Sequence, residues 1–308
     1  MSHTYEFSLE GPSIHGDRQD GALLRDLLSV LVDGSRRAAR FAIEGRSFSA
    51  GPTPAWVQSA GRLEMLSGVR LDHLRFVAPT LREALPQFFE QEPMLPEEEV
   101  VNPERTALDY FGDGLQDAIA GSLDSDRYDD GLVRVFEELG EVFAHGVDRI
   151  RWLNGHSFDV VPSGVESVGR LRKQTPKDQA ARVAGTLNTI RHSDRKFELV
   201  QPSGGVIRGV AEETDALREL FGKKVVATGT LKFKPSGSVL RVEAAHLALA
   251  NEGELRVLGV PPRPWRTPVE IPAARVPQGA RSGLNALVGT WPGNETDEEF
   301  AALVRAVS

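Results

Sequence analysis

Three aspartates repeat at a spacing of four in the segment 107–119, and such a repeat can present carboxylates to a metal ion. On a helix that turns about 100° per residue, Asp109, Asp113 and Asp117 lie roughly 100–180° away from Leu108. The apolar residues of the segment share the side of Leu108, so the carboxylates lie opposite the face that we expect to be buried. We therefore predict a solvated acidic face rather than a metal site.

Other chemical motifs in the sequence are incomplete. The acidic run DSDRYDDG (124–131) has Asp129 and Val135 where a calcium-binding EF-hand loop requires a glycine and a glutamate. We predict instead that Asp129 or Asp130 is the N-cap of the next helix. GHSFD (155–159) is not a G-x-S-x-G motif, and the sequence holds no Walker loop, no GxGxxG motif and no closely spaced histidine pair. The sequence thus predicts no catalytic residue, no metal and no cofactor, while a site assembled from distant residues stays open.

Composition indicates a soluble protein of two domains. A chain of 308 residues exceeds the usual size of one domain, and 40% hydrophobic with 26% charged residues is typical of globular proteins. The absence of cysteine excludes disulfides and thiolate chemistry, and no apolar run approaches the ~20 residues of a membrane helix. The first residues, MSHTYEFSLEGPS, lack the basic start and apolar centre of a signal peptide, so we expect a cytoplasmic protein.

Charge is distributed unevenly along the chain, whose net charge is −8. Residues 1–166 carry 15 arginines, no lysine and 29 acidic residues, whereas residues 167–250 carry 15 basic and 8 acidic residues. All seven lysines fall between Lys173 and Lys234. This contrast predicts an acidic domain (1–166) and a basic domain (167–250), and the basic domain either binds nucleic acid or docks on the acidic one.

The acidic domain has the patterns of mixed helices and strands. Apolar residues repeat every three or four positions over 107–119 and 130–144, which predicts two amphipathic helices. We also expect a helix over 22–32, ended by Gly34, and a strand over 38–44.

Shorter patterns predict further elements of this domain. A helix is expected from Trp56 to Leu66, and a strand over 69–76. Thr80 and Glu83 fit a capping box for a helix that Pro86 interrupts.

The segment VDRIRWLNGHSFDVV (147–161) fits a β-hairpin with an Asn-Gly signal. A three-residue loop places Trp152 opposite Phe158 and Ile150 opposite Val160, which keeps the apolar residues on one face. Because register follows the apolar face, we favour this pairing over the one that a two-residue loop would give.

The basic domain has the strand order of an OB-fold. Strands are predicted over 181–190, 195–200, 206–211, 224–233 and 239–249, with one helix between the third and fourth strands. The segments ARVAGTLNTIRHSDRKFELVQPSGGVIRGV and LFGKKVVATGTLKFKPSGSVLRVEA resemble the strands of OB domains in their order and in the placement of glycines. The resemblance implies a five-stranded barrel at about 178–250 that binds oligonucleotides, oligosaccharides or proteins.

Six basic residues of this barrel are candidates for a nucleic-acid site. In OB domains the first loop, the fourth-to-fifth loop and the second and third strands form the binding groove, so the resemblance implies that these residues lie there. They are Arg191, His192, Arg195, Arg208, Lys232 and Lys234. A positive groove attracts phosphates, and aromatic rings add stacking. The aromatic residues on these strands are Phe197 and Phe233, and their alternation with apolar neighbours predicts that both belong to the core.

The last part of the chain (251–308) is a proline-rich arm that ends in a short amphipathic helix. Thr296 and Glu299 fit a capping box, and four apolar residues that follow share one helical face. These four are Phe300, Leu303, Val304 and Val307. So short a helix needs another surface to be stable in water, and that surface is either the protein's own core or a partner.

The segment WPGNET (291–296) resembles the tail of small bacterial proteins that sit beside PIN-domain ribonuclease toxins. The resemblance implies an antitoxin-like contact with a protein partner, a toxin, in which the aromatic anchors supply most of the affinity. The implied contact residues are Trp291, Glu295, Phe300 and Leu303.

Together these patterns predict a bacterial-type α+β protein. A mixed helix/strand domain (1–166) is followed by a five-stranded OB-like β-barrel (167–250) and by the arm with its short helix (251–308). The predicted function is that of a non-enzymatic interaction or regulatory protein, antitoxin-like, that contacts a protein partner through its tail. The alternative is binding of RNA or single-stranded DNA through the barrel, and the third hypothesis is an unrecognised hydrolase or nuclease in the N-terminal domain.

Overall fold

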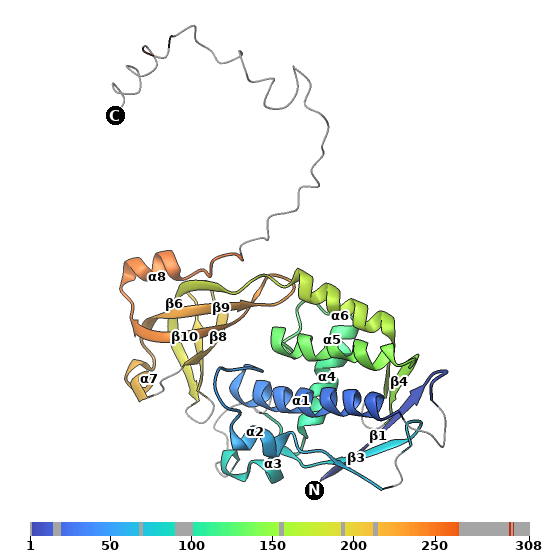
Figure 1. Ribbon diagram of the computed structural model, residues 1–308. Helices are drawn as coiled ribbons and strands as arrows, with labels where there is room; N and C mark the ends of the chain where they lie inside the picture. The colour runs from blue at the N-terminus through green and yellow to red at the C-terminus, as the bar shows by residue number, and fades with distance from the viewer. Residues whose placement is uncertain are drawn as a thin grey trace. The chain divides into compact units, whose positions relative to one another are not determined.

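The computed structural model describes residues 2–14, 20–67, 70–89, 101–153, 157–191, 195–211 and 215–264, together with Thr296 and Glu298. These residues confirm an α+β protein in which a sheet covered by helices is followed along the chain by a closed barrel (Figure 1). Residues Met1–Trp265 form one compact unit that contains both. Within the described ranges, each helix is too short or too polar to cross a bilayer.

A five-stranded antiparallel sheet underlies the N-terminal part. It consists of β1 (His3–Glu10), β2 (Glu64–Met65), β3 (Leu74–Ala78), β4 (Arg149–Trp152) and β5 (Phe158–Val160), in the order β2-β3-β1-β4-β5. The central strand β1, which we did not predict, buries every second side chain: Tyr5, Phe7 and Leu9. The predicted hairpin register is confirmed, because Trp152 pairs with Phe158 and Ile150 with Val160.

Four long helices pack on the buried face of this sheet. They are α1 (Gly21–Glu44), α4 (Ala107–Ile119), α5 (Asp130–Ala144) and α6 (Pro162–Gln174), and they share one apolar core with the strands. Helices α4 and α5 confirm the predicted periodicity, and Asp129 is the N-cap of α5. Three short elements, α2 (Ala55–Ala60), α3 (Leu81–Ala84) and the 3-10 turn η1 (Pro86–Phe88), complete this part. The capping box of Thr80 and Glu83 is present at α3.

The prediction of a helix ended at Gly34 and followed by a strand was wrong, because α1 continues to Glu44. Gly34 lies against the ring of Phe111 on α4, and a Cβ at this position would lie 2.2 Å from that ring. The glycine thus permits two helices to approach closely. Helix α1 ends instead at Gly45, which adopts φ +75° and donates its N–H to the Phe41 carbonyl at 2.8 Å.

The second half of the unit is a closed mixed barrel, compatible with an OB-like fold. Its strands are β6 (Gln179–Arg191), β7 (Lys196–Val200), β8 (Val206–Ala211), β9 (Lys224–Phe233) and β10 (Val239–Leu249). They close in the order β10-β8-β7-β6-β9, and β8 and β10 run parallel. Helix α7 (Asp215–Leu220) connects β8 to β9, and α8 (Glu252–Leu258) packs on the outside through Leu255. Phe197 and Phe233 belong to the barrel core, as predicted.

Replacing Gly34 tests whether close helix packing determines this residue. Gly34→Ala should lower the free energy of unfolding by about 1–3 kcal/mol, because the Phe111 ring must move to admit the methyl group. Urea unfolding followed by circular dichroism measures the change. Gly21→Ala is the matched control, since a Cβ at the start of the same helix meets nothing within 4 Å. Equal stability of the two variants would contradict the packing explanation.

Candidate binding cavity

A cavity of about 390 Å³ lies where the end of α1 and the start of α4 face barrel strands β7 and β8. Five cationic and three acidic side chains line it, a balance of +2. The cations are Arg105, Arg127, Lys196, Arg208 and Arg241, and the acids are Asp113, Asp126 and Glu198. A concave site that gathers this many charges from both halves of the unit is suited to a polar, anionic ligand.

The barrel side of the cavity presents an exposed arginine beside a lysine that is held in place. The Arg208 side chain is 61% exposed and lies 3.4 Å from Asp126 and 3.9 Å from Glu198. These contacts are long, so the guanidinium retains capacity for another anion. Lys196 donates from Nζ to the Ala42 carbonyl at 2.7 Å, which fastens β7 to the end of α1.

The helical side of the cavity supplies an aromatic ring and an ion pair. The Arg105 guanidinium lies 4.5 Å from the centre of the Tyr110 ring and donates to Asp113 at 2.8 Å. Burial lowers the pKa of Arg105, but the hydrogen bond and charge of Asp113 outweigh it and raise this pKa overall. Burial also raises the pKa of the Tyr110 hydroxyl, so the ring is presented in its neutral form. The Phe41 ring, from the last turn of α1, lines the same cavity.

The predicted solvated face of aspartates on α4 was wrong for Asp113, which is only 9% exposed. Arg105, from the segment before α4, pairs with it, and Asp113 lines the cavity that faces the barrel. Asp109 completes the capping box that Thr106 begins at the start of α4, and it accepts the Tyr5 hydroxyl at 2.7 Å; Asp117 accepts the Ser125 hydroxyl at 2.6 Å. Among the described residues, no three His, Asp or Glu side chains gather as metal ligands would.

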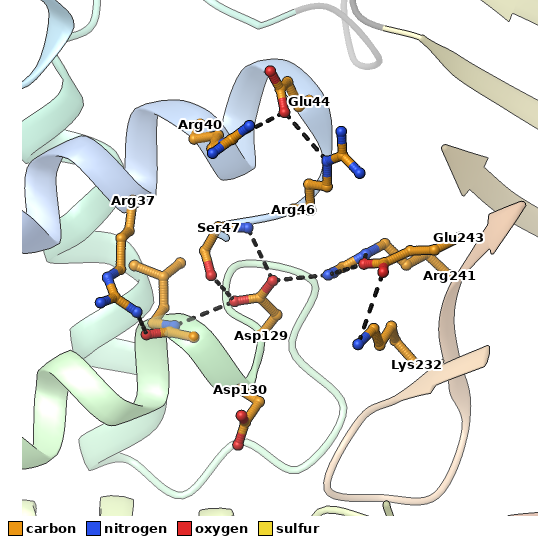
Figure 2. Close-up of polar contacts among 12 residues, drawn as sticks. Arg37, Arg40, Glu44, Arg46, Ser47, Asp129, Asp130, Lys232, Arg241 and Glu243 are labelled. Carbon is orange, nitrogen blue, oxygen red and sulfur yellow. Dashed lines mark hydrogen bonds and ion pairs between the residues drawn. The ribbon is translucent and has the colours of Figure 1, made fainter. Parts of the chain in front are cut away.

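A buried ion pair behind the cavity joins the N-terminal part to the barrel (Figure 2). Arg241 on β10 donates to Asp129 at 3.0 Å, and both side chains are 7% exposed. Ser47 donates to Asp129 from its backbone N–H and its hydroxyl, while Glu243 accepts from Arg241 at 2.9 Å. Burial raises the pKa of Asp129, but the charge of Arg241 and the bonds from Ser47 hold it below its usual range.

The loop between β9 and β10 (residues 234–238) makes a second connection to the N-terminal part. Lys234 lies 2.9 Å from the Asp126 carboxylate and donates to the Asp124 carbonyl at 3.0 Å. Ser236 and Ser238 donate their hydroxyls to the Asp124 carboxylate at 2.8 and 2.6 Å. The acidic run 124–131, which lacks an EF-hand pattern, therefore contacts the basic barrel. Of the two alternatives given for the basic domain, docking on the acidic domain is thus observed.

The six basic residues predicted for a nucleic-acid site lie in different surroundings. Arg208 lines the cavity. Lys234 is buried against the acidic run, and Lys232 pairs with Asp178 and lies 3.8 Å from Glu243. Arg195 is exposed in the turn before β7 with φ +60°. The Arg191 side chain and the whole of His192 lie outside the described residues.

Several cavity residues were not predicted because they come from the other half of the chain. Phe41, Arg105 and Tyr110 belong to the helical part, and no local pattern marks them as partners of a barrel. Lys196 and Arg241 sit on predicted strands next to the chosen candidates, and the cluster of basic residues was the one signal that pointed toward them.

The tail residues predicted to contact a partner, Trp291, Glu295, Phe300 and Leu303, all lie outside the described residues. The antitoxin-like contact therefore stays a prediction. Comparison of the chain with protein-family models, with curated proteins and with solved structures finds no match.

Asp129→Asn tests the ion pair that joins the two parts. It should lower the free energy of unfolding by about 3–5 kcal/mol, because Arg241 is left buried beside an uncharged amide. Asp130→Asn is a matched control: Asp130 is 46% exposed and pairs with Arg134 on the surface, so the loss should stay below about 1 kcal/mol. Denaturant unfolding at neutral pH measures both, and equal losses would contradict the assignment.

In acid, the wild-type protein and Asp129→Asn should have the same free energy of unfolding. The native pKa of Asp129 is lowered, so its stabilising contribution is complete above the unfolded-state pKa of about 3.9 and is lost as pH falls through the native value. Unfolding measured at several pH values below about 5 should show the two proteins converging. A difference that persists unchanged into strong acid would assign the effect to shape rather than charge.

Proposed function

We propose that this protein binds single-stranded nucleic acid in the cavity between the helices and the barrel. The observation that supports the proposal is the gathering of five cationic side chains with the rings of Phe41 and Tyr110 on the β7–β8 side of an OB-like barrel. Cations neutralise phosphates and rings stack on bases, and the two together are the usual elements of single-strand binding.

Arg208 is the residue best placed to receive a phosphate. Its exposed guanidinium makes only long contacts with Asp126 and Glu198, and a phosphate can accept two parallel hydrogen bonds from it. Arg127 is also more than half exposed and lies 3.4 Å from Asp117. A phosphate that binds these arginines replaces weak surface pairs, so little stabilisation is lost.

The aromatic surface comes from the helices. Phe197 and Phe233 are buried in the barrel, so they offer no face to a base. Tyr110 and Phe41 are partly exposed and line the cavity from α4 and α1. Stacking on such rings contributes about 1–3 kcal/mol per base and tolerates any sequence. The N-terminal part thereby supplies what the barrel lacks.

A salt titration with two charge variants tests this proposal. A fluorescent single-stranded oligonucleotide should bind in anisotropy measurements, with an affinity that falls as salt rises. Arg208→Gln should weaken binding about tenfold and make the dependence on salt less steep, because one phosphate contact is lost. Arg218→Gln is the matched control, since Arg218 is an exposed cation of the same barrel outside the cavity lining. Binding that ignores salt, or equal losses in the two variants, would refute the proposal.

Contact with a protein partner through the tail is a separate proposal, supported by the amphipathic pattern of residues 300–307. Removing residues 289–308 should leave a folded protein that no longer captures its partner. A pull-down from native cell extract with nuclease, using full-length protein and residues 1–288, measures this. Loss of folding on truncation would instead indicate that the tail completes the protein's own core.

A further inference from the structure

We infer that the cavity accepts one nucleotide unit, either the end of a strand or a free nucleotide, and excludes the middle of a continuous strand. This inference rests on the proposed function and specifies its ligand. In an open OB-like barrel, a strand can run across the exposed face of the barrel. Here the same chain covers the β7–β8 face from two sides.

The first side is closed by the C-terminal end of α1. Lys196 on β7 is hydrogen-bonded to the Ala42 carbonyl at 2.7 Å. A Cβ placed on Gly45 would lie 3.2 Å from the Lys196 side chain and 3.5 Å from that of Val210 on β8. A single added carbon at this end of α1 would thus already touch side chains of both strands, which leaves too little space for a nucleotide to pass between them.

The second side is bordered by the acidic run, whose Asp126 and Arg127 line the cavity and which the β9–β10 loop holds in place. Lys234, Ser236 and Ser238 are all bonded to Asp124 or Asp126 of the acidic run. The Ser236 N–H also donates to the Leu123 carbonyl at 3.0 Å. A strand leaving the cavity on this side would have to displace the acidic run and break several of these bonds at once, so the run, held by the loop, acts as a wall.

The cavity wall contains an arginine that is held rigidly in place. Nε and Nη2 of Arg241 are engaged by Glu243 and Asp129, which fixes the guanidinium in place. Its Nη1 is buried and has no hydrogen-bond partner among the described residues. An unpaired buried N–H is unfavourable in a folded protein and commonly marks an absent ligand or water.

The volume of the cavity agrees with a single nucleotide as its ligand. At about 390 Å³ the cavity lies near the lower end of the ~300–1,000 Å³ typical of sites for small ligands. A ligand of this size places one base beside Tyr110 and one phosphate near Arg208, and the covered sides leave the next nucleotide outside.

Three probes distinguish the possibilities with the full-length protein. They are a linear single-stranded DNA with a 5′-phosphate, a covalently closed circle of the same length and sequence, and adenosine monophosphate. We expect the linear strand to bind at least about tenfold more tightly than the circle, because only the linear strand has an end. Adenosine monophosphate tested as a competitor identifies the source of the nucleotide: strong competition assigns the cavity to free nucleotides, and weak competition assigns it to strand ends.

Equal binding of circle and linear strand would overturn this inference while leaving the proposed function intact. If none of the three probes bound, the proposed function itself would fail.

Opening the second side gives an independent test. Asp124→Ala removes the acceptor for both serines of the loop and should improve binding of the circle about fivefold, with linear binding little changed. Asp72→Ala is the control, since Asp72 is an exposed aspartate paired with Arg70 away from the cavity. Thermal unfolding verifies that each variant is folded. A folded Asp124→Ala protein that still rejects the circle would show that the acidic run held by the loop is not the wall.

Discussion

The buried pair of Asp129 and Arg241 is the contact on which the arrangement of the two halves depends. Removing two charges from water is costly, and their attraction compensates only when further hydrogen bonds satisfy both groups. Here Ser47 and the α5 backbone donate to Asp129, and Glu243 accepts from Arg241. The pair therefore links the segment after α1, the start of α5 and strand β10. Arg241 itself lines the cavity, and Ser47 and Asp129 each stand two residues from a lining residue, Gly45 and Arg127, so one ion pair helps to hold the cavity walls together.

Much of the fold could be predicted because its signals are local. Each of the correctly predicted elements has a pattern that spans only a few consecutive residues. These elements are helices α4 and α5, the capping box at Thr80 and the five barrel strands. Gly34 shows where local reasoning fails: a glycine that would ordinarily end a helix is needed for the ring of Phe111, which lies far away in sequence. Strand β1 was not predicted for a related reason, because its partners β3 and β4 are distant along the chain.

The candidate site was less predictable than the fold. The resemblance to OB domains located Arg208, because its position follows from strand order. It could not locate Arg105 or Tyr110, because their place beside the barrel depends on contacts between the two halves. It also could not show that Lys234 is used internally, since basic residues at a loop look alike whether they face a ligand or a carboxylate of the same protein.

The same charges serve both docking and the cavity, and this couples the two. Asp126 lies within ion-pair distance of Lys234 in the β9–β10 loop and of Arg208 in the cavity. A phosphate that binds Arg208 competes with Asp126, whose carboxylate then interacts with Lys234 alone. A phosphate on Arg208 also repels the Asp126 carboxylate and leaves Lys234 as its remaining attractive partner, so on the proposed function ligand binding would favour the contact between the loop and the acidic run. Occupancy of the cavity and closure of its second side would thus reinforce each other.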